Sequence, residues 1–257
     1  MTEATVLIVD DDFHEWPFFK EAFGDHAVTV CKSVDELGER LKRGATWDVA
    51  FVDFDLSEKD PELAPDLKEK IPTGLSALKL LRERSDSPVV SYTRMGESGR
   101  ALYCAAAKSW FGANASMDKS LAIPENLQRY VRELGDGRDP TVPLRRAQLA
   151  RTDLINELLP DAMSLRLWRE YYKLDGREDA IQRALPGVTG FTIRKFKGKA
   201  SDAVIQFEKT FFGREVPATK KGEYDNLKGV ITKFAGAHRN FFNAVDLDRA
   251  LSWRDGH

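Results

Sequence analysis

The sequence predicts a doubly wound α/β domain with a parallel sheet, followed by an all-helical half. Three observations support this prediction. Short apolar runs alternate with amphipathic stretches over residues 5–134, and the run at residues 48–54 is almost continuously apolar. Strand patterns nearly vanish after a turn-rich segment at residues 135–143. Continuous apolar runs are typical of strands that are buried on both faces of a parallel sheet.

Five runs rich in β-branched and aliphatic residues predict the strands. We expect them at residues 6–9, 28–31, 48–54, 88–92 and 113–117. Amphipathic stretches between these runs predict the helices, and several begin with a proline or a capping residue. We expect these helices at residues 15–23, 34–41, 74–84, 98–111 and 124–134. The charged segment 55–73, which contains three prolines, predicts a long loop or a partly helical insertion.

The chain of 257 residues is long enough for two domains, and its two halves differ in charge. The net charge is −2, but residues 1–140 carry −8 and residues 141–257 carry +6. An acidic first half suits a metal-binding regulatory module. A basic second half suits contact with a polyanion.

Nothing in the sequence predicts export or a membrane anchor. The acidic first residues lead straight into a predicted strand, which is unlike a signal peptide. No stretch approaches the ~18 uninterrupted apolar residues of a membrane span. Cys31 and Cys104 lie far apart and outside any CxxC spacing, so we expect two buried thiols. A reducing cytoplasm fits these features.

Polar side chains collect where the predicted strands end. Asp10 and Asp11 follow the first strand, Asp53 ends the third, Thr93 ends the fourth and Lys119 follows the fifth. The carboxyl ends of parallel strands meet at one edge of a sheet, so these side chains should lie together. Clustered carboxylates repel one another unless a cation joins them, and oxygen ligands suit Mg²⁺. A carboxylate can also act as a nucleophile and become an acyl phosphate.

These features together resemble the receiver domain of bacterial two-component response regulators. The resemblance covers about residues 5–134 and implies the flavodoxin-like strand order 2-1-3-4-5. The stretches that carry it are VLIVDDD (6–12), DVAFVDFDL (48–56), Gly74, SPVVSYT (87–93) and GANASMDK (112–119).

The resemblance implies a chemical role for the predicted cluster. Asp53 would be the phosphoacceptor, and a sensor histidine kinase or a small phosphodonor would supply the phosphoryl group. The Thr93 hydroxyl and the Lys119 ammonium would bind that group, because the charge that develops on it needs such partners. Asp10 and Asp11 would be the acidic pair that binds Mg²⁺ as cofactor.

Asp53 and the backbone carbonyl of Asp55 would complete the magnesium site.

Four features depart from the pattern of the family. Residues 56–73 form an unusually long connection, and the Asp55 side chain adds negative charge beside the phosphoacceptor. Ser116 stands where the family usually has an aromatic residue, and Ser120 replaces the proline that usually follows the lysine. A pseudo-receiver, with the fold present and phosphorylation unused, therefore remains an alternative.

Residues 135–143 predict a linker between a receiver domain, residues 1–134, and a helical output domain, residues 144–257. The second half carries no output signature that we recognise. Its helices are expected at residues 154–159, 165–174 and 178–185, with another from about residue 190 and a long amphipathic stretch over 224–251. The short turn at residues 186–189 between two of these helices gives a helix-turn-helix pattern.

The second helix of that pattern carries polar and basic side chains suited to DNA. No acidic residue occurs between Ala180 and Ser201. A helix in the major groove needs such donors for phosphates and bases. A solvated basic face is the alternative, and Gly198 could end the helix early. The expected DNA contacts are Thr192, Arg194, Lys195, Lys197 and Lys199.

Apolar and aromatic residues recur at helical spacing over residues 224–251, which predicts one continuous stripe. The simplest interpretation of this stripe is packing in the core. The more specific interpretation is a helix that mediates homodimerisation. The stripe consists of Leu227, Ile231, Phe234, His238, Phe241 and Val245.

The second half contains no Ser/His/Asp set, glycine-rich phosphate loop or metal-ligand spacing, so we do not expect an enzyme. The first hypothesis is therefore a response regulator, phosphorylated on Asp53, that controls transcription through a DNA-binding homodimer. The second is a pseudo-receiver whose helical half binds a protein or RNA partner.

Overall fold

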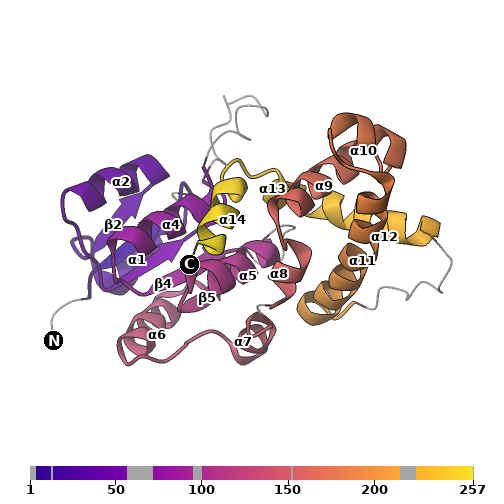
Figure 1. Cartoon of the computed structure of the whole chain (residues 1–257). Coiled ribbons are helices and arrows are strands. Elements are labelled where there is room, and N and C mark those ends of the chain that lie inside the picture. Colours follow the sequence, from indigo (N-terminus) through magenta and orange to yellow (C-terminus); the bar gives the residue numbers. More distant parts are fainter. Residues whose placement is uncertain are drawn as a thin grey trace.

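The computed structural model describes residues 4–12, 14–56, 72–94, 100–151, 153–214 and 224–256. Five parallel strands form one sheet with the order β2-β1-β3-β4-β5 (Figure 1). The predicted fold class, a flavodoxin-like α/β sheet followed by a helical part, is confirmed. The strands are β1 (Val6–Val9), β2 (Val28–Cys31), β3 (Val49–Val52), β4 (Val89–Thr93) and β5 (Ala115–Asp118).

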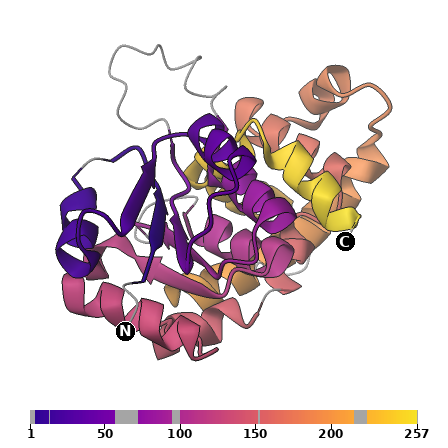
Figure 2. The same ribbon diagram turned by 90° about the vertical axis from the view of Figure 1, so that its left-hand side faces the viewer.

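Helices cover both faces of this sheet, as Figure 2 shows. On one face α1 (Trp16–Phe23) packs beside α6 (Pro124–Gly135). On the other face α2 (Val34–Lys42), α4 (Gly74–Arg84) and α5 (Arg100–Phe111) lie side by side. All four residues of β1 and of β3 are buried, which agrees with their continuously apolar sequence.

Local sequence signals explain where several helices begin. The Ser33 side chain accepts the N–H of Glu36, as in one half of a capping box, and the Glu36 carboxylate accepts the N–H of Lys32, one residue before the cap. Proline occupies the first turn of both α1 and α6. Residues 57–71 and 95–99, which include most of the predicted insertion and the expected start of the helix at residue 98, lie outside the described residues.

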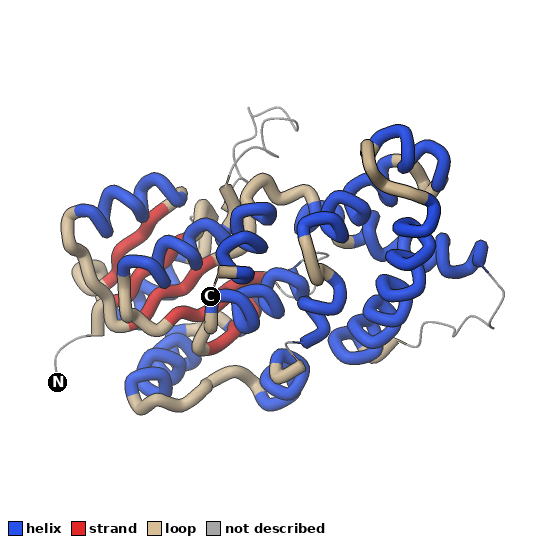
Figure 3. The backbone as a smooth tube through the Cα atoms, in the orientation of Figure 1, coloured by secondary structure: helices blue, strands red, loops and turns tan. Residues whose placement is uncertain are grey.

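The second half of the chain is helical in every described segment (Figure 3). The turn between α10 and α11 lies where the helix-turn-helix pattern was expected, and Thr189 caps α11 by accepting the N–H of Thr192. The helices are α7 (Pro143–Leu149), α8 (Asp153–Leu158), α9 (Ala162–Lys173), α10 (Glu178–Ala184), α11 (Gly190–Phe212), α12 (Tyr224–Ala237), α13 (Arg239–Phe242) and α14 (Leu247–Asp255).

Two expectations for this half need correction. The helix does not end at Gly198, because α11 continues through it to Phe212 and the glycine faces open space. Residues 224–251 are not one helix, because the chain leaves helical geometry at His238 and again after Phe242.

The residues of the apolar stripe therefore belong to separate short helices and do not form one continuous face. Ile231, Phe234 and Phe241 are buried within the chain, whereas Val245 is 44% exposed. His238 is buried among aromatic rings and approaches Glu208, which agrees with a packed histidine. The side chain of Leu227 lies outside the described residues. The structure thus supports the core-packing interpretation of these buried residues.

The C-terminal segment packs on the helices that cover one face of the sheet. Helix α14 contacts α4 and α5, while α7, α8 and α13 also contact α5. The rings of Phe111 and Trp253 stack with their centroids 4.9 Å apart. One cluster of buried apolar residues extends from this face of the sheet into the helical half. The predicted linker, residues 135–143, lies between α6 and α7, but the two halves share a core.

A single aspartate ties this C-terminal segment to the start of α4. The buried Asp246 carboxylate accepts the backbone N–H groups of Thr73 and Ser76 at 2.8 and 3.1 Å, and also the Thr73 hydroxyl. The first N–H groups of a helix have no partner inside it, so this carboxylate caps α4 from a distant part of the sequence.

No helix among the described residues is long and apolar enough to cross a membrane.

Candidate functional site

Four side chains meet at the carboxyl edge of the sheet, as the strand ends predict. Asp10 and Asp53 follow β1 and β3, Thr93 ends β4, and Lys119 follows β5; all four are buried. The Lys119 ammonium lies between the two carboxylates, 2.7 Å from Asp10 Oδ2 and 2.8 Å from Asp53 Oδ2. The edge therefore holds a buried ion cluster, because each buried charge needs a partner of opposite sign.

Arg100 is a member of this cluster that sequence reasoning missed. It is the first described residue of α5, and only 4% of it is exposed. One guanidinium nitrogen donates to Thr93 Oγ1 at 2.9 Å and lies 3.3 Å from Asp53 Oδ1. A second nitrogen lies 4.0 Å from the Asp55 carboxylate. The available signal was an arginine at the start of an alanine-rich helix whose residues are almost all buried.

Asp53 is the centre of this cluster. Its Oδ1 accepts the backbone N–H of Phe54 at 2.7 Å and the longer bond from Arg100, while Oδ2 accepts from Lys119. Both oxygens of the carboxylate are thus held by donors, and two of the three donors are cations. Charge-assisted bonds of this kind are stronger than neutral ones and fix the orientation of the carboxylate.

The cluster shifts the pKa values of its neighbours. Burial, together with the negative charge of Asp53, raises the pKa of Asp10 from 3.8 to about 7. Burial alone would lower the pKa of Lys119, but the Asp53 and Asp10 carboxylates raise it above its ordinary value. Lys119 also lies over the Tyr92 ring, whose hydroxyl donates to Glu15 at 2.9 Å. The cation is therefore held from several sides.

The three aspartates that follow β1 differ in burial and in hydrogen-bond partners. Asp10 Oδ1 accepts the backbone N–H of Asp12, which orients the loop. Asp11, which the resemblance assigns to metal, is only partly buried. Asp12 is buried instead, accepts the N–H of His14 and lies 3.4 Å from Arg94. Asp12 belongs to the same edge and was not among the predicted residues.

The side chains at this edge do not fit a magnesium ion as they lie. Within the described part of the chain, no group of three or more histidine, cysteine, aspartate or glutamate side chains is arranged to hold a metal. The facing oxygens of Asp10 and Asp53 share the Lys119 ammonium, and Arg100 approaches the other Asp53 oxygen. Two basic side chains supply the positive charge that an ion was expected to bring.

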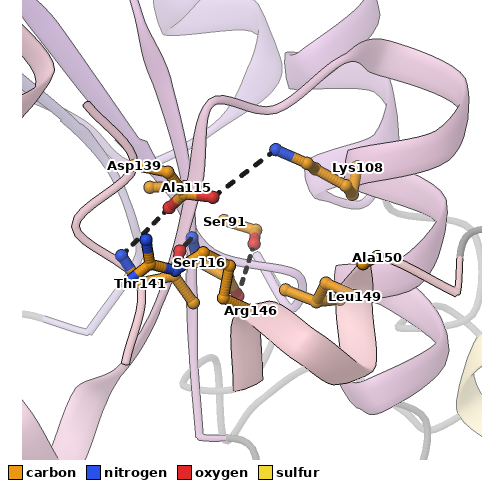
Figure 4. A pocket seen from close by; sticks show the side chains of 9 residues that line it. All are labelled: Ser91, Lys108, Ala115, Ser116, Asp139, Thr141, Arg146, Leu149 and Ala150. Atoms are coloured by element: carbon orange, nitrogen blue, oxygen red, sulfur yellow. Dashed lines mark hydrogen bonds and ion pairs between the residues drawn. The ribbon is translucent and has the colours of Figure 1, made fainter. Parts of the chain in front are cut away.

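Ser116, which stands where an aromatic residue was expected, lies beneath the linker. Its hydroxyl bonds to Ser91, and its backbone N–H donates to the Thr141 hydroxyl, both at 2.9 Å. Figure 4 shows the cavity beside it, about 230 Å³ in volume, with Lys108 facing Asp139 across 3.7 Å. The linker and α7 thus cover this part of β5 and line the cavity together with it.

The predicted DNA contacts on α11 do not share one environment. Arg194, Lys195 and Lys199 are exposed, and Thr192 is half-buried beside Thr189. Lys197 is buried and pairs with Glu178 of α10, so it joins the two helices.

No family model and no curated protein matches the chain. The fold and the edge cluster define it as an α/β protein with a five-stranded, all-parallel sheet and flanking helices, an arrangement compatible with a receiver-like fold.

The raised pKa of Asp10 predicts a pH-dependent stability. Between pH 3.8 and about 7 the folded chain retains a proton that the unfolded chain has lost, so this contribution to stability falls as the pH rises. Asp10→Asn should remove this slope. At pH 8 the variant should be more stable than the wild type by on the order of 1–4 kcal/mol, and at pH 4 it should have no such advantage.

Urea unfolding of both proteins across this pH range measures the effect. Asp25→Asn, at an exposed carboxylate, is the matched control and should keep the slope of the wild type. The same pH dependence of stability in Asp10→Asn and the wild type would contradict a raised pKa of Asp10 as its cause.

Proposed function

We propose that the chain is a response regulator in which Asp53 accepts a phosphoryl group from a histidine kinase or a small phosphodonor. The observation that carries this proposal is the position of Asp53 at the carboxyl edge of the sheet. Its carboxylate lies buried with Lys119 bonded to one oxygen, and Arg100 joins the other oxygen to the Thr93 hydroxyl. Ligands of open parallel sheets bind at this edge.

The chemistry of the cluster suits phosphoryl transfer. An Asp53 oxygen attacks the phosphorus atom, and the bond from phosphorus to the leaving group breaks. Negative charge is then spread over three phosphoryl oxygens, and positive side chains and a hydroxyl stabilise it. Lys119, Arg100 and Thr93 are the described groups of these types beside the carboxylate. The magnesium requirement implied by the resemblance stays a prediction.

Packing links the Asp53 cluster to the helical half, which is what a regulated output needs. The ring of Phe54, the next residue, lies 5.1 Å from Tyr103 of α5 and 6.0 Å from Phe241 of α13. A Cβ atom at Gly74 would lie 1.9 Å from the Asp53 carbonyl oxygen, so α4 begins in direct contact with the phosphoacceptor. Asp246 caps that same helix from the C-terminal segment.

We propose DNA as the target of the helical half, with phosphorylation shifting a monomer–dimer or closed–open equilibrium. The exposed side chains of Arg194, Lys195 and Lys199 follow the turn between α10 and α11, where a recognition helix would carry its phosphate and base contacts. The positive charge of this half favours association with a polyanion. A cytoplasmic location is part of the same proposal.

A second candidate function is a pseudo-receiver whose helical half binds a protein or RNA. The bonds to Asp53 favour it, because Lys119, Arg100 and the Phe54 N–H already hold both oxygens of the carboxylate that would attack phosphorus. In that case the cluster would stabilise the fold, and the exposed basic residues of α11 would serve a different partner.

Phosphorylation of Asp53 is tested with acetyl phosphate and intact-mass measurement. We expect an added mass of one phosphoryl group on the wild type in the presence of Mg²⁺, and no adduct on Asp53→Asn. Asp48→Asn alters a carboxylate just before the same strand, at its opposite end, and should leave the adduct unchanged. Absence of any adduct on the wild type under excess donor would favour the pseudo-receiver.

DNA binding is tested by replacing exposed basic residues of α11. Arg194→Ala with Lys195→Ala should weaken binding to duplex DNA by about tenfold or more and reduce its salt dependence, because counterion release depends on the number of phosphate contacts. Lys42→Ala with Arg43→Ala removes the same charge from the exposed end of α2 and should have little effect. Equal DNA affinity of the two double variants would refute a DNA-reading α11.

A further inference from the structure

Two carboxyl groups and two basic side chains meet at the buried centre of the cluster. Lys119 lies within 2.8 Å of both Asp10 and Asp53, and Arg100 lies beside the other oxygen of Asp53. All four are at most 6% exposed. Burial of ions without partners is costly, so the second cation is as necessary to this edge as the first.

Arg100 lies where a phosphoryl group attached to Asp53 would need positive charge. One of its guanidinium nitrogens contacts both the Asp53 carboxylate and the Thr93 hydroxyl, the two groups expected on either side of that phosphoryl group. Its backbone belongs to α5, whose residues are almost all buried, so the side chain starts from a fixed point.

We propose that Arg100 takes the place of the divalent cation at this site, so that Asp53 accepts a phosphoryl group without a metal. This inference rests on the proposed function. A guanidinium carries several donors in one plane, matches the geometry of phosphate oxygens and keeps its charge at any physiological pH.

The transfer step balances with the groups at this edge. An Asp53 oxygen forms a bond to the phosphorus of acetyl phosphate, and the bond between phosphorus and the acetate oxygen breaks. Acetate leaves with the electron pair of that bond, so nothing is oxidised or reduced. Arg100 and Lys119 then face the phosphoryl oxygens, and the Thr93 hydroxyl turns from Arg100 to the new group.

The test measures adduct formation from acetyl phosphate by intact mass, once with EDTA and once with Mg²⁺. We expect the wild type to react at rates within about threefold of each other in the two conditions. An adduct that forms only with Mg²⁺ would overturn the role of Arg100 and leave the proposed function standing. No adduct in either condition would overturn both.

Variants of Arg100 provide the second arm. In EDTA, Arg100→Gln should lower the rate of adduct formation at least tenfold, whereas Arg100→Lys should retain more of it because the charge remains. Arg82→Gln alters another arginine that joins two elements, through the carbonyls of Phe111 and Gly112, and should react like the wild type. An unchanged rate in Arg100→Gln would overturn the inference.

Circular dichroism and urea unfolding establish that each variant is folded before its rate is compared. If Arg100→Gln does not fold, the rates of Arg100→Lys and of the wild type in EDTA still decide. A wild type that needs Mg²⁺, or an Arg100→Lys variant whose rate in EDTA equals that of Arg100→Gln in a folded protein, counts against the role of Arg100.

Discussion

The bonds from Lys119 and Arg100 to the Asp53 carboxylate constrain much of the rest of the structure. Both oxygens of this buried carboxylate are occupied, so the strand end, the residue after β5 and the start of α5 must all meet at one point. Removing one partner would leave an uncompensated buried charge, which typically costs about 3–5 kcal/mol. The bonds that orient the Asp53 carboxylate therefore also hold β3, β5 and α5 together. A change in the charge of Asp53 would alter both the site and the packing of these elements.

The elements that hold the site also carry the helical half. Helix α4 begins against the Asp53 carbonyl and is capped by Asp246 from the segment before α14, while α5 contributes Arg100 at one end and stacks Phe111 on Trp253 at the other. Interfaces of this kind are packed and change between discrete arrangements more readily than they deform. A new charge at Asp53 would thus act on α4 and α5 first, and through them on the C-terminal helices.

The sheet and most of the site were predictable because strand ends are local signals. Asp10, Asp53, Thr93 and Lys119 follow apolar runs, and parallel pairing alone brings them together. Arg100 was not predictable in this way, since its role depends on where α5 starts relative to β3. Lys197 is basic and lies in the predicted recognition helix, so the sequence suggested a DNA contact. Its pairing with Glu178 depends on how α10 packs against α11, which the sequence does not show. The stripe over residues 224–251 has one period, but its breaks at His238 and after Phe242 arise from tertiary packing.

A double-mutant cycle between Asp53 and Arg100 tests the buried ion cluster most directly. The free energies of urea unfolding of the wild type, Asp53→Asn, Arg100→Gln and the double variant give the coupling between the two side chains. The structure predicts a favourable coupling of about 1–3 kcal/mol, because each single change leaves the other charge buried with one partner fewer. A coupling of zero would show that Arg100 does not stabilise the Asp53 carboxylate.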